Sequence, residues 1–283
     1  MAVYKRGYEP YTGRLTPEWS RFLIIARHAY RGMFESRFLV SFLVVCFIYP
    51  VVAAVLVYLP HNAAAMAVFD VRKLFPVDGA FFLKFLSWQG TLAFLLTGFM
   101  GPGLVAVDLA NNALPLYFCR PFSRAEYVVG KMAVLGFVLS AITWVPGLIL
   151  FAFAAYLEGF AWFTGHLRFA FAVFVGSWLW IVALCLLALA ISAWVKWRIA
   201  AGALLFGLFF VAAGFGQAIN HSMNTDLGHM VNLASIIGAI WAWLLHESAP
   251  MPVANAWFSL SAAYAACYWL LRRKLRAYQV ERA

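Results

Sequence analysis

The amino-acid sequence predicts an all-α integral membrane protein with six transmembrane helices, an N-terminal interfacial elbow helix and an external re-entrant segment before the last helix. Hydrophobic residues make up 65% of the chain and charged residues only 11%, a composition that excludes an ordinary soluble domain. The apolar residues form six runs, each close to the roughly 20 residues that a helix needs to cross the hydrocarbon core. These runs cover residues 38–59, 85–107, 132–157, 169–195, 199–219 and 253–271.

Lysine and arginine gather on alternate sides of these runs. If both termini are cytoplasmic, seventeen of the 21 basic residues lie inside, and the four outside are Arg72, Lys73, Lys84 and Arg168. The positive-inside rule expects this bias, which predicts a multi-pass protein of the plasma (inner) membrane with both termini in the cytoplasm. The net charge of +10 then reflects topology and contact with anionic membrane lipid rather than a nucleic-acid partner.

The leader, residues 1–37, precedes the first run. Thr16, Pro17 and Glu18 form a typical helix start, with an N-cap, a proline at the first helical position and an acid in the first turn. From residue 18 to 37, arginines and other polar residues share one helical face, and aromatic and aliphatic residues share the other. We expect a helix lying in the cytoplasmic membrane interface; a solvated helix packed on a soluble domain is the less favoured alternative.

Three of the predicted spans contain helix-breaking residues. Pro50 lies in the first, the segment 98–103 with three glycines and a proline in the second, and Pro146 with Gly147 in the third. Such breaks are tolerated where neighbouring helices satisfy the freed backbone groups. They indicate either hinges or, more commonly in membrane helices, sites of close packing.

A further apolar stretch at 231–245 is too short to count as a span. Fifteen helical residues extend only about 22 Å, less than the hydrocarbon thickness. A seventh crossing would also place the basic tail, residues 272–283, outside, against the positive-inside rule. We therefore expect a re-entrant or surface-lying external segment anchored by Trp241 and Trp243, within a transmembrane domain that covers 38–271.

The sequence offers no catalytic, cofactor-binding or metal-binding constellation. None of the predicted spans carries Asp, Glu, Lys or Arg near its middle, and no nucleotide-binding motif is present. A metal site at His221, Asp226 and His229 is a weak alternative, and the scattered cysteines are expected to be packing residues. The chain is predicted not to be an enzyme.

The inside segment 108–131 is the strongest candidate contact surface. It mixes aromatic residues with Arg120 and Arg124 over a stretch too short for a domain, and exposed aromatics and arginines are typical of interface cores. Ser123 and Glu126 have the spacing of a capping box and predict a helix start that continues into the third span. A loop buried against its own helices is the alternative.

This segment resembles the corresponding loop of ABC-2-type transporter permeases. In that family an acidic residue after the second span leads to Leu-Tyr-x-x-Arg-Pro-x-Ser-Arg and then to Tyr-x-x-Gly-Lys. Here Asp108 precedes a Leu-Tyr-Phe-Cys-Arg-Pro-Phe-Ser-Arg stretch at 116–124 and Tyr-Val-Val-Gly-Lys at 127–131. The leader, with Tyr-Lys-Arg-Gly-Tyr at 4–8, and the order of elements are also similar.

The resemblance implies a permease subunit of an ABC exporter that pairs with a second copy or a paralogue. A separate cytoplasmic ATP-binding subunit would bind the ATP and dock on the loop, whereas the chain itself would hold no cofactor. The implied docking and coupling residues are Asp108, Tyr117, Arg120, Pro121, Ser123, Arg124, Glu126, Tyr127, Gly130 and Lys131.

Two other hypotheses remain open from the sequence. The chain could be a membrane enzyme or assembly factor acting at the external face, with Asp226, His229 and Glu247 as its sparse candidates. It could also be a non-transporting anchor that recruits a cytoplasmic partner through the loop at 108–131. The substrate and its route through the membrane are not predicted.

Overall fold

The computed structural model describes Gly13, Arg27, Tyr30 and the ranges 34–62, 76–113 and 123–280. The described residues are helical apart from short connections, and none of them forms a strand. The elements are α2 (Arg37–Tyr58), η2 (Leu59–His61), α5 (Gly79–Met100), α6 (Pro102–Ala110), α8 (Arg124–Ile142), α9 (Trp144–Glu158), α10 (Phe160–Gly165), α11 (Leu167–Trp194), α12 (Arg198–Met223), η3 (Leu227–Met230), α13 (Leu233–Leu245) and α14 (Val253–Val280).

Within the described ranges, five helical segments are long and apolar enough to cross a membrane. They are Arg37–His61, Gly79–Ala110, Arg124–Glu158, Leu167–Trp194 and Arg198–Met223. Four of them contain one of the first five predicted runs, and Leu167–Trp194 covers all but the last residue of the run 169–195. The sixth run lies in α14, which has 28 residues but carries serines, tyrosines and a basic end that lower its hydropathy. The all-helical membrane class is therefore confirmed with five candidate spans, and the crossing at 253–271 stays a prediction.

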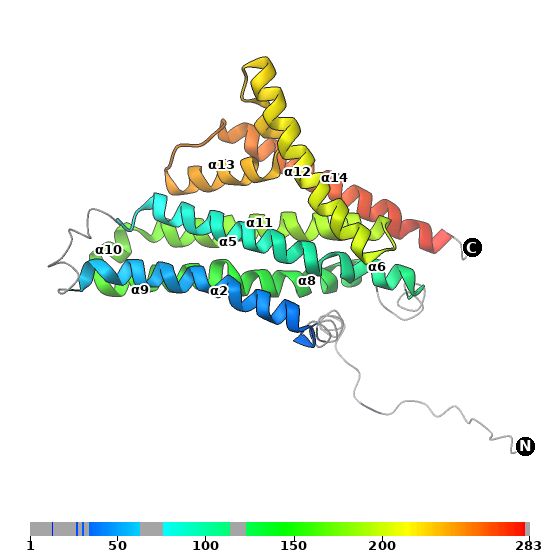
Figure 1. Cartoon of the computed structure of the whole chain (residues 1–283), viewed down its shortest axis with the longest axis horizontal. Coiled ribbons are helices and arrows are strands. Elements are labelled where there is room, and N and C mark those ends of the chain that lie inside the picture. Colours follow the sequence, from blue (N-terminus) through cyan, green and yellow to red (C-terminus); the bar gives the residue numbers. More distant parts are fainter. Residues whose placement is uncertain are drawn as a thin grey trace, which may run out of the picture.

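The long helices run side by side, and α12 crosses them obliquely (Figure 1). The beginning of α2, the end of α6, the turn between α11 and α12 and the end of α14 lie toward the same end of the molecule. We call this the basic end, because Lys131, Lys196, Arg198 and the residues 272–274 belong to it. The opposite end carries α10 and the connection from α13 to α14.

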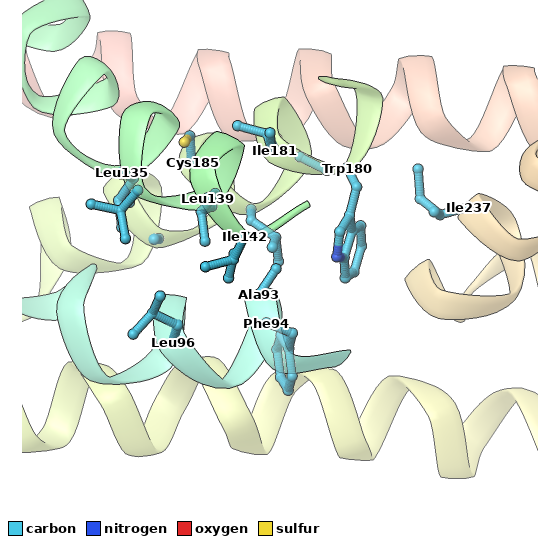
Figure 2. Close-up of a cluster of buried hydrophobic side chains, with 14 of the residues drawn as sticks. Ala93, Phe94, Leu96, Leu135, Leu139, Ile142, Trp180, Ile181, Cys185 and Ile237 are labelled. Atoms are coloured by element: carbon cyan, nitrogen blue, oxygen red, sulfur yellow. The ribbon is translucent and has the colours of Figure 1, made fainter. Parts of the chain in front are cut away.

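Helix α11 is the centre of the bundle. It packs against α5, α6, α8, α9, α13 and α14, and its buried residues include Trp180, Ile181 and Cys185. Figure 2 shows these side chains next to Leu96 of α5 and Leu139 of α8, within one continuous apolar core. In contrast, only 22% of the most apolar 18-residue stretch of the first span, which contains α2, is buried, and only 17% of that of α12. These two helices therefore form the outer faces of the bundle.

The helix-breaking residues have distinct structural outcomes. Pro50 lies inside a continuous α2, and because proline has no N–H, it frees the carbonyl four residues earlier. That carbonyl belongs to Cys46, and it accepts a hydrogen bond of 3.1 Å from the amide Nε2 of Gln89, a buried residue of α5. The polar Gln89 side chain thus satisfies the backbone group that Pro50 leaves open, as expected in a hydrocarbon environment.

The other two breaks divide a span into two helices. Gly101 separates α5 from α6, and Thr143 separates α8 from α9. Pro146 explains the second break, because its ring clashes with the carbonyl of Ile142 in a regular helix. Close packing accompanies both breaks: a Cβ at Gly101 would lie 2.6 Å from the Cβ of Ala188, and one at Gly147 would lie 2.6 Å from Val173.

The short helix α13 is buried inside the bundle rather than lying on its surface. It packs against α5, α11 and α14, and eight of its 13 residues are buried. Trp241 is only 5% exposed, so the expectation that it anchors the segment in the membrane interface is wrong. Trp243, 46% exposed, fits that role better. The alternation of buried and exposed tryptophans follows from their positions on opposite faces of the helix.

Contacts at both ends hold α13 in place. Before it, Gly228 packs on α12 so closely that a Cβ there would lie 1.9 Å from the carbonyl oxygen of Gly216. After it, Arg168 of α11 donates from Nε to the carbonyl of Leu244 at 2.6 Å and from its NH2 group to that of Trp243 at 2.9 Å. The arginine thus donates to two carbonyls in the last turn of the helix, where intrahelical partners become scarce.

The membrane orientation is tested by single cysteines at the two ends of the bundle. Ser248→Cys follows α13, Lys196→Cys lies between α11 and α12, and both positions are exposed. We expect a membrane-impermeant thiol reagent to label the cysteine at 248 in intact cells and the one at 196 only after permeabilisation. A cysteine-free background removes the native thiols, of which Cys46 and Cys185 are buried. Labelling of position 196 from outside would contradict the predicted topology.

Candidate functional site

The candidate site lies at the basic end, where the second span ends and the third begins. Helix α6 ends at Ala110, and Asn112 takes a left-handed conformation with φ of 49°, which is typical of a helix C-terminus. Helix α8 begins after Ser123, whose hydroxyl accepts from the N–H of Glu126 at 3.2 Å while the Glu126 carboxylate accepts from the N–H of Ser123 at 2.6 Å. The predicted capping box is confirmed.

Three polar side chains from these two helices meet in a partly buried cluster, which we call the Asp108 cluster. The carboxylate Oδ2 of Asp108 accepts a hydrogen bond of 2.7 Å from the hydroxyl of Tyr127. The same oxygen lies 2.8 Å from the ammonium Nζ of Lys131. The Lys131 ammonium also lies 5.6 Å from the centre of the Tyr127 ring, within the range of a cation–π contact.

Burial makes the Asp108 cluster a strong structural constraint. The side chains of Lys131 and Asp108 are 8% and 14% exposed, and Tyr127 is 1% exposed. Removing one partner from a buried ion pair leaves an uncompensated charge, which costs much more than losing a surface pair. Tyr127 and Lys131 are four residues apart and therefore share one face of α8, so the cluster fixes the end of α6 against the start of α8.

The start of α6 is held by a serine from the central helix. The hydroxyl oxygen of Ser192 in α11 accepts from the backbone N–H groups of Val105 and Ala106, each at 3.1 Å. These amides lie in the first two turns of α6, which begins at Pro102. The short helix α6 is thus fixed at its beginning by Ser192 and near its end by Asp108.

The leader contacts the third span through Tyr30. Its hydroxyl donates to the carbonyl of Ala133 at 2.8 Å, and its ring lies 5.4 Å from that of Phe137, both in α8. Burial raises the pKa of the Tyr30 phenol to about 12, so the hydroxyl stays protonated and remains a donor. Tyr30 belongs to the predicted apolar face of the elbow helix; most of that helix lies outside the described residues.

The predicted site residues fall into three groups. Asp108, Tyr127 and Lys131 come together, with the buried Gly130 beside them, and Ser123 and Glu126 form the cap. Arg124 begins α8 and is half-buried. Tyr117, Arg120 and Pro121 lie outside the described residues. Sequence reasoning missed Ser192 and Gln89, although each is a polar residue inside a predicted apolar run, which is a usable signal for interhelical hydrogen bonding.

The opposite end offers less chemistry. In the described part of the chain, no group of three or more His, Cys, Asp or Glu side chains could hold a metal ion, and this includes His221, Asp226 and His229. His229 instead lies with its Nδ1 3.4 Å from the hydroxyl of Ser235. Glu247 lies against Gly79 at the start of α5.

Neither a scan against protein-family models nor a search of curated proteins found a match for this chain.

Proposed function

We propose that this chain is the transmembrane permease subunit of an ABC transporter of the ABC-2 type. It forms the substrate pathway as a dimer, with a second copy or a paralogue, in the plasma (inner) membrane. Separate cytoplasmic ATP-binding subunits dock on the loop between α6 and α8 and drive export. Six crossings, including residues 253–271, place both termini in the cytoplasm.

The observation that carries the proposal is the Asp108 cluster. A loop that transmits force from a docked ATPase needs both flanking helices to move with it, because a loosely attached loop would absorb the displacement. The contacts of Asp108 with Tyr127 and Lys131 link α6 to α8 next to the residues that resemble the permease motif. Ser192 then connects α6 to the central helix α11, which packs against most of the bundle.

Affinity purification of the tagged chain from its own host in mild detergent tests the proposal. We expect mass spectrometry to identify an ATP-binding protein in roughly stoichiometric amount. Its absence, in preparations where other membrane complexes survive, would favour the anchor or external-face hypotheses.

Two arginine variants distinguish a specific docking contact from a general effect of surface charge. Arg120→Glu changes the proposed docking loop, and Arg272→Glu changes an exposed arginine elsewhere at the basic end. If Arg120 is a central interface residue, the first variant should lower recovery of the ATPase about tenfold or more. Equal recovery with both variants would contradict a docking role for Arg120.

A further inference from the structure

A second feature of the basic end is an apolar groove between the α5–α6 junction and α12. Its volume is about 750 Å³, and its lining includes Gly98, Gly202 and Phe206. The glycines allow the helices to approach closely: a Cβ at Gly98 would lie 2.1 Å from the Phe206 ring, and one at Gly202 would lie 3.2 Å from the Gly98 carbonyl oxygen. The volume falls within the range of ligand-binding cavities.

One charged side chain lines this groove among the described residues, namely Arg198. Its guanidinium lies beside Gly103: a Cβ added to Gly103 would lie 3.5 Å from the arginine Nε. No carboxylate in the described part of the chain lies within ion-pair distance of it. Among the described residues, Arg198 is therefore a cation without a counter-ion at the boundary of an apolar cavity.

The order of residues along α12 matches the shape of an amphiphile. Trp197, 79% exposed, and Arg198, which is also exposed, line the groove at the N-terminal end of α12, and an exposed tryptophan at the end of an apolar helix is typical of the headgroup level of a membrane. Phe206 follows Arg198 by eight residues, or about 12 Å of helix. The groove is thus basic at the N-terminal end of α12 and apolar further along the helix, as a ligand with one anionic end and one hydrocarbon chain requires.

We infer that this groove binds one anionic phospholipid, with its phosphate on Arg198 and an acyl chain along Gly98, Gly202 and Phe206. Charge complementarity favours this occupant over a second copy of the chain, because an arginine presents a planar donor array that suits phosphate. Basic pockets between transmembrane helices bind anionic headgroups in the same way. The inference requires only that the chain lies in a membrane and does not depend on an ATPase partner.

Native mass spectrometry of the detergent-purified full chain tests the inference with phosphatidylglycerol and phosphatidylcholine of identical acyl chains. We expect one phosphatidylglycerol to be retained in preference to phosphatidylcholine. A hydrogen bond to a charged group contributes more to the binding free energy than a neutral contact does. Arg198→Gln should therefore weaken phosphatidylglycerol binding about tenfold or more. Arg198→Lys should retain part of the affinity. The matched control Lys196→Gln removes an exposed charge outside the groove and should change affinity by less than about twofold.

A second pair of variants tests the apolar part. Ala203 lines the groove, whereas its neighbour Leu204 is 49% exposed and lies outside it. Ala203→Trp should abolish retention of phosphatidylglycerol, and Leu204→Trp should preserve it. Equal losses of phosphatidylglycerol affinity for Arg198→Gln and Lys196→Gln would overturn the inference, because they would indicate non-specific attraction to the basic end. Displacement of phosphatidylglycerol by glycerol phosphate alone would show that the groove binds an anion without an acyl chain. Dimers that form without lipid and that Ala203→Trp dissociates would show that a second copy of the chain occupies the groove. Either result would overturn the inference.

Discussion

Replacing Asp108 by alanine is expected to lower the free energy of unfolding by about 3–5 kcal/mol, the cost of breaking a buried ion pair. The Lys131 side chain, 8% exposed, would then lose its carboxylate partner, and the Tyr127 hydroxyl would lose the acceptor at 2.7 Å. For a chain of this size the midpoint of thermal unfolding should fall on the order of 10 °C. Fluorescence-detected gel filtration after heating measures that midpoint.

The double variant Asp108→Ala/Lys131→Met separates the ion pair from general damage at the position. Replacing both charges removes the uncompensated ammonium, so stability should return most of the way to that of the wild type. Under the proposed permease function, ATP turnover by the docked partner should stay impaired, because α6 and α8 would still lack their polar link. A double variant as unstable as Asp108→Ala would show that the ion pair is not the source of the effect.

The second large effect is expected at Trp241, which locks α13 into the bundle. Its indole N–H donates to the carbonyl of Gly176 at 2.9 Å, and its ring lies where a Cβ at Gly90 would come within 2.6 Å of it. Trp180 makes the reciprocal contact, donating to the carbonyl of Gly90 at 2.8 Å. The two indole rings meet edge to face with their centres 6.3 Å apart.

Trp241→Ala should therefore destabilise the protein by about 3–5 kcal/mol, since it empties a packed site and removes the indole hydrogen bond to the Gly176 carbonyl. Trp243→Ala is the matched control, because Trp243 lies on the same helix and is 46% exposed. It should cost less than about 1 kcal/mol. Similar losses in thermal stability for the two variants would contradict the buried position of Trp241.

The spans were predictable because hydrocarbon imposes one dominant constraint, an uninterrupted apolar helix of sufficient length. Helices α2, α11 and α12 follow directly from runs of that kind. The divisions at Gly101 and Thr143 were only partly visible. Glycine and proline at 101–103 indicate a break, but the effect of Pro146 appears at Thr143, because proline disturbs the turn that precedes it.

The position of α13 could not be read from the sequence. Its length and its two tryptophans suit an interfacial helix, but its environment depends on tertiary partners. Gly90 and Gly176 create the space for Trp241, and Arg168 satisfies its terminal carbonyls. Sequence distances of 65 to 90 residues separate the paired groups, so local pattern carries no information about them.

The candidate site was predictable as a set of residues but not as a geometry. The capping box at Ser123 follows from spacing alone. The spacing of Tyr127 and Lys131 predicts a shared helical face, but their partner depends on how α6 returns against α8. Ser192 lies outside the motif, and its contribution follows from the packing of α11 on α6.

Site-specific photo-crosslinking in native membranes tests the central claim most directly. A photoreactive residue at Ala125, exposed near the start of α8, lies next to the proposed docking loop, and one at Ser248 lies at the opposite end. The account predicts an adduct between position 125 and an ATP-binding protein and no such adduct from position 248. An adduct from position 125 only to proteins without a nucleotide-binding domain, in cells where the chain is inserted and stable, would contradict it.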